Sequence, residues 1–273
     1  MRPPGPWEPL WEGWSRAMAA RALARSTVRG RRGGWVSWMA HVGDRWAEAG
    51  HVEVEAWLAG RGLGTSATCS ALSDLASFYR WARREGLTAA NPTDLVDRPR
   101  RPRRVPRPAD PAGVERALAL GEQVERRAVA VMVYAGLRCC ELAGLAVGDV
   151  DLVEGWLEVT GKGGHRRRVP IFRPLEPWLA GLAGVEASTP VYPSPRGGFT
   201  SAGRVSARVG AHLRAAGAGA TAHQLRHRYG THLYGRHGDL QLVALLMGHA
   251  NVSTTQGYAE ASLGGHGAPR DLW

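Results

Sequence analysis

Residues 135–142 place a glycine, an arginine and a glutamate at a spacing that suits phosphate binding. Gly136 is expected to end a helix, and Arg138 follows at the expected start of the next one. Glu141 lies about one turn further on, where its carboxylate can orient the Arg138 guanidinium. An arginine near a helix N-terminus is suited to clamping a phosphate. Surface arginines are common in this chain, so the segment alone does not define a site.

Lys162 is the single lysine among the 35 lysine and arginine residues of the chain. It lies in a glycine-rich turn, residues 161–164, between two segments that alternate as strands do. Arginine stays charged at any working pH, whereas a lysine with a depressed pKa can lose and regain a proton. The position therefore indicates proton transfer, and the alternative is a surface lysine retained by chance.

A third group of reactive side chains lies in residues 221–227, where a threonine can cap a helix. A spacing of three puts His223 and Arg226 on one helix face, where both could contact one phosphate. The alternative is a zinc site made by His223 and His227 at i, i+4. Zinc proteases with that spacing carry a glutamate base after the first histidine, and Gln224 cannot serve as that base.

Two further candidates lie near the end of the chain. His249 follows a glycine, and Tyr258 comes nine residues later within residues 254–259. A lone histidine after glycine is more often a cap, and a lone tyrosine is more often packing. Neither residue indicates a reaction by itself.

In order and content, these four groups resemble the tyrosine recombinase (phage integrase) family, which includes the Xer recombinases and Cre. The matching motifs are a GLRxxEL box, a hairpin lysine, an HxLRH box, an LGH-type box and a TxxYA segment. The resemblance covers residues 110–259, and residues 77–82 resemble the family's core-binding domain with lower specificity. It implies a catalytic set made of Arg138, Lys162, His223, Arg226, His249 and Tyr258.

The resemblance implies DNA strand exchange through a covalent 3′-phosphotyrosine. Tyr258 would attack the scissile phosphate. Arg138 and Arg226 would neutralise charge on its non-bridging oxygens. His223 would accept the tyrosine proton, and Lys162 would protonate the 5′-oxygen leaving group.

The remaining residues and the partners also follow from the resemblance. His249 would donate a hydrogen bond to a phosphate oxygen, and Glu141 would support Arg138. No metal and no cofactor are expected, because the cationic side chains replace a metal and the phosphotyrosine conserves the bond energy. The expected partners are double-stranded DNA and further subunits, in a homo-tetramer or a hetero-tetramer with a paralogue.

Residues 259–273 form the expected C-terminal tail, a segment that this family passes to a neighbouring subunit. Three glycines in the tail disfavour a long helix, and its last residues, Leu272 and Trp273, could form an apolar plug. We expect that deleting residues 263–273 alters assembly more than DNA binding.

Helical periodicity predicts only helices in the first part of the chain. We expect them over residues 8–24, 34–42, 52–59 and 66–85. Seven of the eleven tryptophans lie within the first sixty residues. Most of these rings are expected in the core, because a small bundle needs large side chains.

In the later part of the chain, residues 156–160 and 166–171 alternate and predict a β-hairpin with Lys162 at its tip. The other expected elements are helices over residues 112–120, 122–135, 175–182, 201–215, 222–234 and 240–247, with short helices near 138 and 254–259. The fold class is therefore mainly α with a small β-hairpin or sheet.

The resemblance gives these elements a domain organisation. It implies a helical, SAM-like core-binding domain at 1–97 and a mixed α/β catalytic domain at 110–273, together forming a C-shaped DNA clamp. Between them, residues 98–109 form an extended linker with four prolines and six arginines, which repel one another unless phosphates lie nearby. The expected DNA-binding residues are Arg100, Arg101, Arg103, Arg104, Arg166 and Arg167.

The composition agrees with a nucleic-acid partner. A formal net charge of +11 favours a polyanionic partner. A membrane surface is the weaker alternative, because the sequence shows no amphipathic helix with a consistently basic face. The N-terminus lacks the apolar core of a signal peptide, and the longest apolar stretch, 128–137, is too short to span a bilayer. Three cysteines do not form a disulfide framework, so we expect a cytoplasmic protein.

Two other functions share these features. A type IB topoisomerase would use the same chemistry to relax DNA, and a non-catalytic DNA-binding regulator would keep the fold. The helical N-terminal part and short tail favour a recombinase over a topoisomerase, and the complete residue set argues against a regulator. With no room for an arm-binding domain before the first helix, a Xer-like resolvase or a simple integrase is expected.

Overall fold

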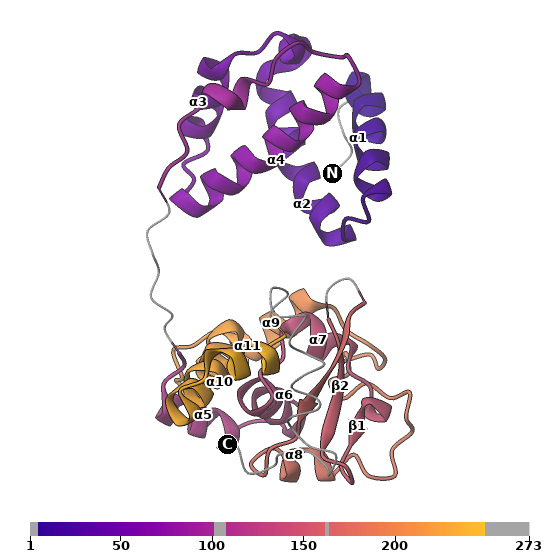
Figure 1. The fold of residues 1–273 in the computed structure, drawn as a ribbon, viewed down its shortest axis with the longest axis vertical. Coiled ribbons are helices and arrows are strands. Elements are labelled where there is room, and N and C mark those ends of the chain that lie inside the picture. The colour runs from indigo at the N-terminus through magenta and orange to yellow at the C-terminus, as the bar shows by residue number, and fades with distance from the viewer. Residues whose placement is uncertain (1–4, 101–107, 162–163, 249–272) are drawn as a thin grey trace. The chain divides into compact units, whose positions relative to one another are not determined.

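The computed structural model describes residues 5–100, 108–161, 164–248 and 273. The chain separates into two compact units, Met1–Arg104 and Val105–Trp273, and the boundary lies within residues 98–109 (Figure 1). Most described residues are helical, with one small antiparallel sheet. The predicted fold class, mainly α with a small sheet, is therefore confirmed.

The first unit is built from helices, as the periodicity predicted. Three short 3-10 segments, Gly5–Trp7, Gly43–Ala47 and Pro92–Leu95, connect or flank these helices. The α-helices are α1 (Glu8–Ala20), α2 (Arg25–Val42), α3 (His51–Gly60) and α4 (Thr65–Arg84). No described helix in the chain is long and apolar enough to cross a membrane.

Helix α2 begins nine residues before the predicted start at residue 34. Three glycines among its first ten residues have low helix propensity, which is why the sequence pattern indicated a later start. Tertiary contacts outweigh that propensity. Arg31 of α2 donates to Asp74 at 3.2 Å and to Ser77 at 3.0 Å, and both partners lie on α4.

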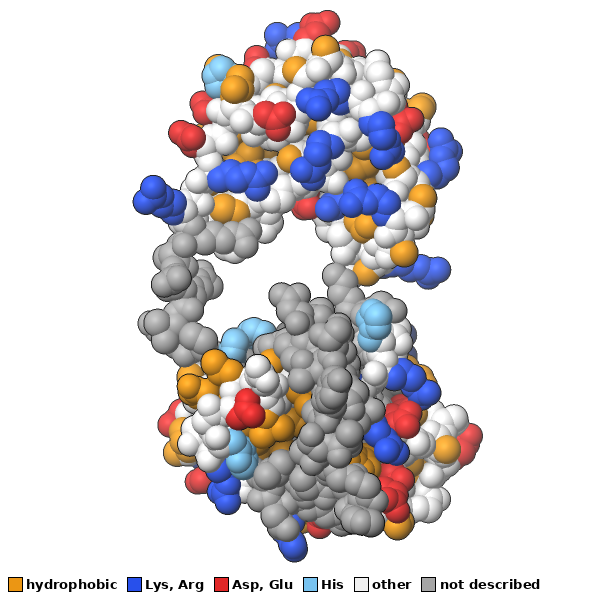
Figure 2. All heavy atoms as spheres, in the orientation of Figure 1, with side chains coloured by type: hydrophobic (Ala, Val, Ile, Leu, Met, Phe, Trp, Pro, Cys, Tyr) orange, Lys and Arg blue, Asp and Glu red, His pale blue; other side chains and the backbone are white. Residues whose placement is uncertain are grey.

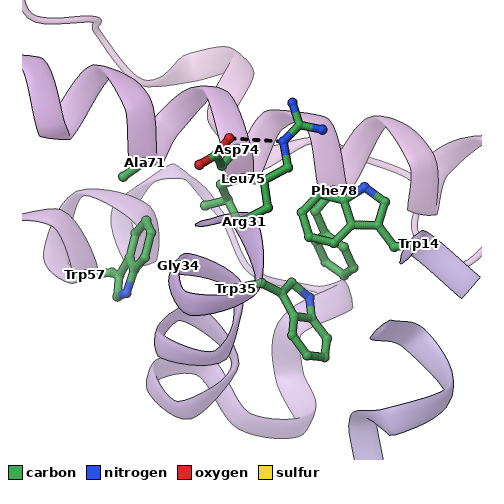
Figure 3. Close-up of a pocket in the computed structure, with 9 residues that line it drawn as sticks. All are labelled: Trp14, Arg31, Gly34, Trp35, Trp57, Ala71, Asp74, Leu75 and Phe78. Atoms are coloured by element: carbon green, nitrogen blue, oxygen red, sulfur yellow. Dashed lines mark hydrogen bonds and ion pairs between the residues drawn. The ribbon is translucent and has the colours of Figure 1, made fainter. Parts of the chain in front are cut away.

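Aromatic rings form the core of the first unit. Five of the seven early tryptophans are buried, which confirms the prediction that most are core residues. Trp14 and Trp35 lie edge-on to Phe78, with ring centroids 5.4 and 6.0 Å apart. These rings and Trp57 line a small hollow that the Arg31–Asp74 ion pair borders (Figure 3). The hollow is thus part of the packing of this unit.

The second unit combines helices with the sheet. Its elements are α5 (Pro111–Ala119), α6 (Gln123–Tyr134), α7 (Cys139–Gly144), a 3-10 turn (Val147–Asp149), β1 (Val150–Asp151), β2 (Trp156–Thr160), β3 (Arg166–Pro170), α8 (Glu176–Ala180), α9 (Ala202–Ala215), α10 (Ala222–His237) and α11 (Leu240–Leu246). Residues 128–133 of α6 are all buried, so α6 is the central helix. Figure 1 shows the sheet on one side of α6 and helices α10 and α11 on the other.

The predicted hairpin is present as strands β2 and β3, which pair antiparallel with Val159 opposite Arg167. The sheet also contains β1, which pairs with β2 and was not predicted. Two residues are too few to show the alternation that identifies a strand. The helix predicted over 254–259 lies outside the described residues.

Candidate active site

The candidate site is centred on the buried carboxylate of Glu141, whose side chain is 0% exposed. Glu141 lies in the first turn of α7 and accepts a hydrogen bond from the backbone N–H of Arg138 at 2.7 Å. That bond closes the start of the helix, because the first N–H groups of a helix have no partner within it. The Glu141 carboxylate therefore caps the start of α7 and also binds the side chains that surround it.

Arg138 is one of these side chains. Its Nη1 donates to Glu141 at 2.8 Å, and its Nη2 donates to the carbonyl oxygen of Gly248 at 3.4 Å. The Arg138 side chain is 39% exposed, so part of its guanidinium faces solvent. The structure places Glu141 where the sequence analysis expected it to support Arg138.

Arg226 approaches the same carboxylate from α10. Its Nη1 lies 3.7 Å from Glu141, and its two Nη groups donate to the carbonyl oxygens of Gly136 and Met247. Burial lowers the pKa of Arg226 to about 10, with a further lowering from the charge of Arg138. Arg226 still carries its charge at neutral pH.

The structure places Arg167, which the sequence analysis assigned to DNA binding, beside Glu141 and not on the exposed surface. Its side chain is 6% exposed, and its Nη1 and Nη2 donate to the two oxygens of Glu141 at 2.7 and 3.0 Å. Strand β3 alternates, so Arg167 shares the buried face with Val169, while Arg166 and Arg168 face outward. That alternation was the sequence signal that could have identified Arg167 as an inward-facing residue.

The charges at this centre do not balance. One carboxylate faces three guanidinium groups, from Arg138, Arg167 and Arg226, which leaves a net charge of +2 on these four side chains. Burial alone would raise the pKa of Glu141, but hydrogen bonds and charge from Arg167 and Arg138 lower it below its usual value. Glu141 is therefore ionised at neutral pH, and the surplus charge suits an anion such as a phosphate.

His223 lies one turn before Arg226 on α10. Thr221 caps this helix and exchanges hydrogen bonds with Gln224, in the capping position that the sequence suggested. Desolvation lowers the pKa of His223, and the charges of its neighbours, His227 first, lower it further. An exposed imidazole that is neutral at pH 7 can accept a proton.

The His223 and His227 rings are in edge contact, with centroids 4.3 Å apart. Among the described residues, no group of three or more histidine, cysteine, aspartate or glutamate residues could hold a metal ion.

Three predicted catalytic residues, Lys162, His249 and Tyr258, lie outside the described residues. Two of them have described neighbours in the chain. A side chain at Gly161, the residue before Lys162, would lie 3.8 Å from both Arg167 and Glu141. Gly248, the residue before His249, contacts the Arg167 side chain and accepts the bond from Arg138.

Two of the remaining DNA-binding candidates are described. Arg100 is exposed, and Arg166 is exposed with an ion pair to Glu158 at 3.1 Å. The other three candidates, Arg101, Arg103 and Arg104, lie outside the described residues.

Comparison with known proteins identifies the family. The model of the phage integrase family matches residues 113–263, which is more than half of the chain. The tyrosine recombinase XerC of Pelobacter propionicus is 36% identical over 207 residues, covering 70% of this chain and 68% of that protein. The tyrosine recombinase XerD of Pseudomonas aeruginosa is 35% identical over 219 residues, covering 74% of each chain.

A solved structure shares the fold. A lambda integrase tetramer bound to a Holliday junction matches with a TM-score of 0.71 at 21% identity, covering 88% of this chain and 76% of that one. The chain belongs to the phage integrase family of tyrosine recombinases. Its function is site-specific DNA recombination, and the topoisomerase and regulator alternatives are not favoured.

Proposed function

We propose that this chain breaks and rejoins DNA strands through a covalent bond between Tyr258 and the 3′-phosphate at the cleavage site. The observation that carries the proposal is the surplus of positive charge around Glu141, beside a histidine whose pKa is lowered. Such a site can hold a phosphodiester and accept a proton without a metal ion.

In this proposal, Arg138 and Arg226 bind the non-bridging oxygens of the scissile phosphate. Arginine suits this task because its planar group of N–H donors matches phosphate geometry. The surrounding protein excludes water from Arg226, which strengthens its attraction for charge that develops in the transition state. Glu141 fixes the direction of Arg138 through two hydrogen bonds.

Proton transfer is assigned to two other residues. His223 accepts the proton of Tyr258 during attack and returns it during religation, which requires a neutral imidazole at the start. Lys162 gives its proton to the 5′-oxygen as that oxygen leaves. His249 donates a hydrogen bond to a phosphate oxygen from the position next to Gly248.

A trapped covalent adduct tests this proposal directly. A suicide substrate carries the target sequence, selected from random DNA by binding, with a nick beside the cleavage site. The wild-type chain is expected to form a protein–DNA adduct that survives denaturing electrophoresis. Tyr258→Phe is expected to bind the same DNA in a gel shift but form no adduct, because phenylalanine has no nucleophile. An adduct with Tyr258→Phe, or none with the wild type, contradicts the proposal.

We propose that the first unit, residues 1–97, binds the DNA duplex together with the catalytic unit. Figure 2 shows arginine side chains spread over the visible face of the first unit. Helix α2 carries four arginines and no acidic residue, and Arg25 and Arg29 at its start are exposed. Exposed arginines without acidic neighbours in the same helix suit contacts with phosphates. Residues 98–109, whose first arginines include the exposed Arg100, are proposed to follow the DNA backbone between the units.

The proposed active form is a tetramer on DNA in the cytoplasm, made of this chain alone or with a paralogue. Support comes from the lambda integrase structure, which is a tetramer bound to a Holliday junction. Similarity to XerC and XerD favours a Xer-like resolvase or a simple integrase.

The C-terminal tail is proposed to take part in this assembly. Trp273 stacks on His232, with centroids 4.1 Å apart, and contacts Tyr134, Phe172 and Tyr229. We expect deletion of residues 263–273 to lower tetramer formation at least about tenfold, which is the usual effect of losing an aromatic anchor at an interface. Binding of a single subunit to its DNA site is expected to be unchanged. Crosslinking and gel shifts measure the two quantities, and Phe199→Ala, which removes an exposed ring, is the control. Unchanged assembly would show that the tail has no such role.

A further inference from the structure

We propose that Arg167 is a positioning residue for the two phosphate-binding arginines. It occupies both oxygens of Glu141 and thereby leaves N–H groups of Arg138 and Arg226 free to bind the scissile phosphate. This inference rests on the proposed function and adds to it a residue that the family motifs of the sequence analysis did not include.

The first argument is how the Glu141 carboxylate is shared. A carboxylate binds an arginine best through two parallel hydrogen bonds, one to each oxygen. Glu141 gives this arrangement to Arg167, at 2.7 and 3.0 Å. The Arg138 guanidinium donates only one bond to Glu141, at 2.8 Å, and the Arg226 guanidinium lies 3.7 Å from it. The two arginines assigned to the phosphate are therefore held more loosely by Glu141 than Arg167 is.

The second argument is that Arg167 is poorly placed to bind the phosphate itself. Both of its Nη groups are bound to the charged carboxylate of Glu141, which compensates the charge of Arg167. Arg226 is as deeply buried, but its Nη groups donate to neutral backbone carbonyl oxygens, so its charge remains available to a phosphate. Gly248 covers Arg167 so closely that a Cβ there would lie 2.7 Å from Arg167 Cδ and Nε. Nε of Arg167 has no hydrogen-bond partner among the described residues, so a direct contact through that atom is the alternative to be tested.

The third argument concerns what Glu141 would do without Arg167. Its carboxylate is 0% exposed and ionised, so water cannot replace the two lost bonds. The nearest side-chain donors are the guanidinium groups of Arg138 and Arg226. We expect Glu141 to form additional hydrogen bonds to these two groups. Fewer N–H groups would then be available to the scissile phosphate, and its negative charge would be neutralised less well.

The test compares two substrates that differ in the charge of the scissile group. The first is an ordinary phosphodiester suicide substrate. In the second, a methyl group replaces one non-bridging oxygen, which makes a neutral methylphosphonate that needs less help from the arginines. The variants are Arg167→Met and the conservative Arg167→Lys. The matched control is Arg168→Met, because Arg168 is the exposed next residue of the same strand.

Arg167→Met is expected to form adduct about 10²-fold more slowly than the wild type on the phosphodiester, the usual effect of losing one oxyanion-stabilising contact. On the methylphosphonate, its rate is expected within about fivefold of the wild-type rate. Arg167→Lys keeps the charge but only one strong bond to Glu141, so a smaller loss of about tenfold is expected, relieved in the same way. Arg168→Met is expected to match the wild type on both substrates.

An equal deficit of Arg167→Met on both substrates overturns the inference, because that pattern indicates general damage to the fold. A deficit relieved instead by sulfur at the 5′ bridging position also overturns it, since Arg167 would then act on the leaving group. Lost DNA affinity in Arg167→Lys, with no relief on the methylphosphonate, would identify Arg167 as a direct phosphate ligand. Circular dichroism checks folding, and if Arg167→Met does not fold, Arg167→Lys carries the same comparison. Failure of the proposed function is distinguishable, because the wild type would then form no adduct.

Discussion

Lys162→Arg is expected to slow cleavage of ordinary DNA about 10³-fold while leaving DNA binding unchanged. The substitution keeps a positive charge in the hairpin turn but removes a side chain that can give up its proton near neutral pH. The 5′-oxygen would then leave as an alkoxide, which is a poor leaving group. The chain uses arginine at its 34 other basic positions and lysine only here. This indicates that the position needs the chemistry of lysine and not only a positive charge.

Sulfur at the 5′ bridging position of the substrate identifies the step that is lost. A thiolate leaves without a proton, so Lys162→Arg is expected to cleave this substrate at nearly the wild-type rate. His165→Arg is the control, because it adds an arginine directly after the same turn at an exposed position. Single-turnover adduct formation measures all four combinations. Full-rate cleavage of ordinary DNA by Lys162→Arg would show that Lys162 is only a surface residue.

Gly136→Ala is expected to lower the free energy of unfolding of the second unit by about 3 kcal/mol, the combined effect of backbone strain and overpacking. Gly136 has φ +64°, a conformation that costs a residue with a Cβ. A Cβ there would also clash with the Tyr229 ring, which is fully buried. Cleavage is expected to fall as well, because the Gly136 carbonyl oxygen accepts a hydrogen bond from Arg226.

Gly203→Ala is the matched control for this substitution. Gly203 is an exposed residue of α9, and no atom lies within 4 Å of a Cβ built there. Alanine favours a helix, so this variant is expected to be as stable as the wild type or up to about 1 kcal/mol more stable. Urea unfolding followed by circular dichroism measures both variants. Equal stability of Gly136→Ala and the wild type would contradict the close contact with Tyr229.

Local signals in the sequence were sufficient to predict most elements of the fold. The cap at Thr221, the break at Gly136 and the alternation of the hairpin each depend on residues within a few positions of one another. Such patterns survive in the folded chain because tertiary packing agrees with them. The early start of α2 was missed because Arg31 is held by Asp74, which is 43 residues away in the sequence.

The same distinction applies to the candidate site. The motif around Arg138 was sufficient to predict its partner Glu141, three residues away. The involvement of Arg167 with Glu141 was missed because the two residues are 26 positions apart and meet only when the sheet packs against α7 through β2. Arg166 and Arg167 were both assigned to DNA binding, although Arg167 faces the core.

The net charge of +2 around Glu141 couples the stability of the enzyme to its substrate. In the free protein, guanidinium groups that repel one another are held together by one carboxylate, so part of the folding free energy opposes this arrangement. A phosphodiester that enters the site relieves the repulsion and binds only the folded form, which raises the free energy of unfolding. Affinity for the scissile phosphate and resistance to unfolding are thus linked.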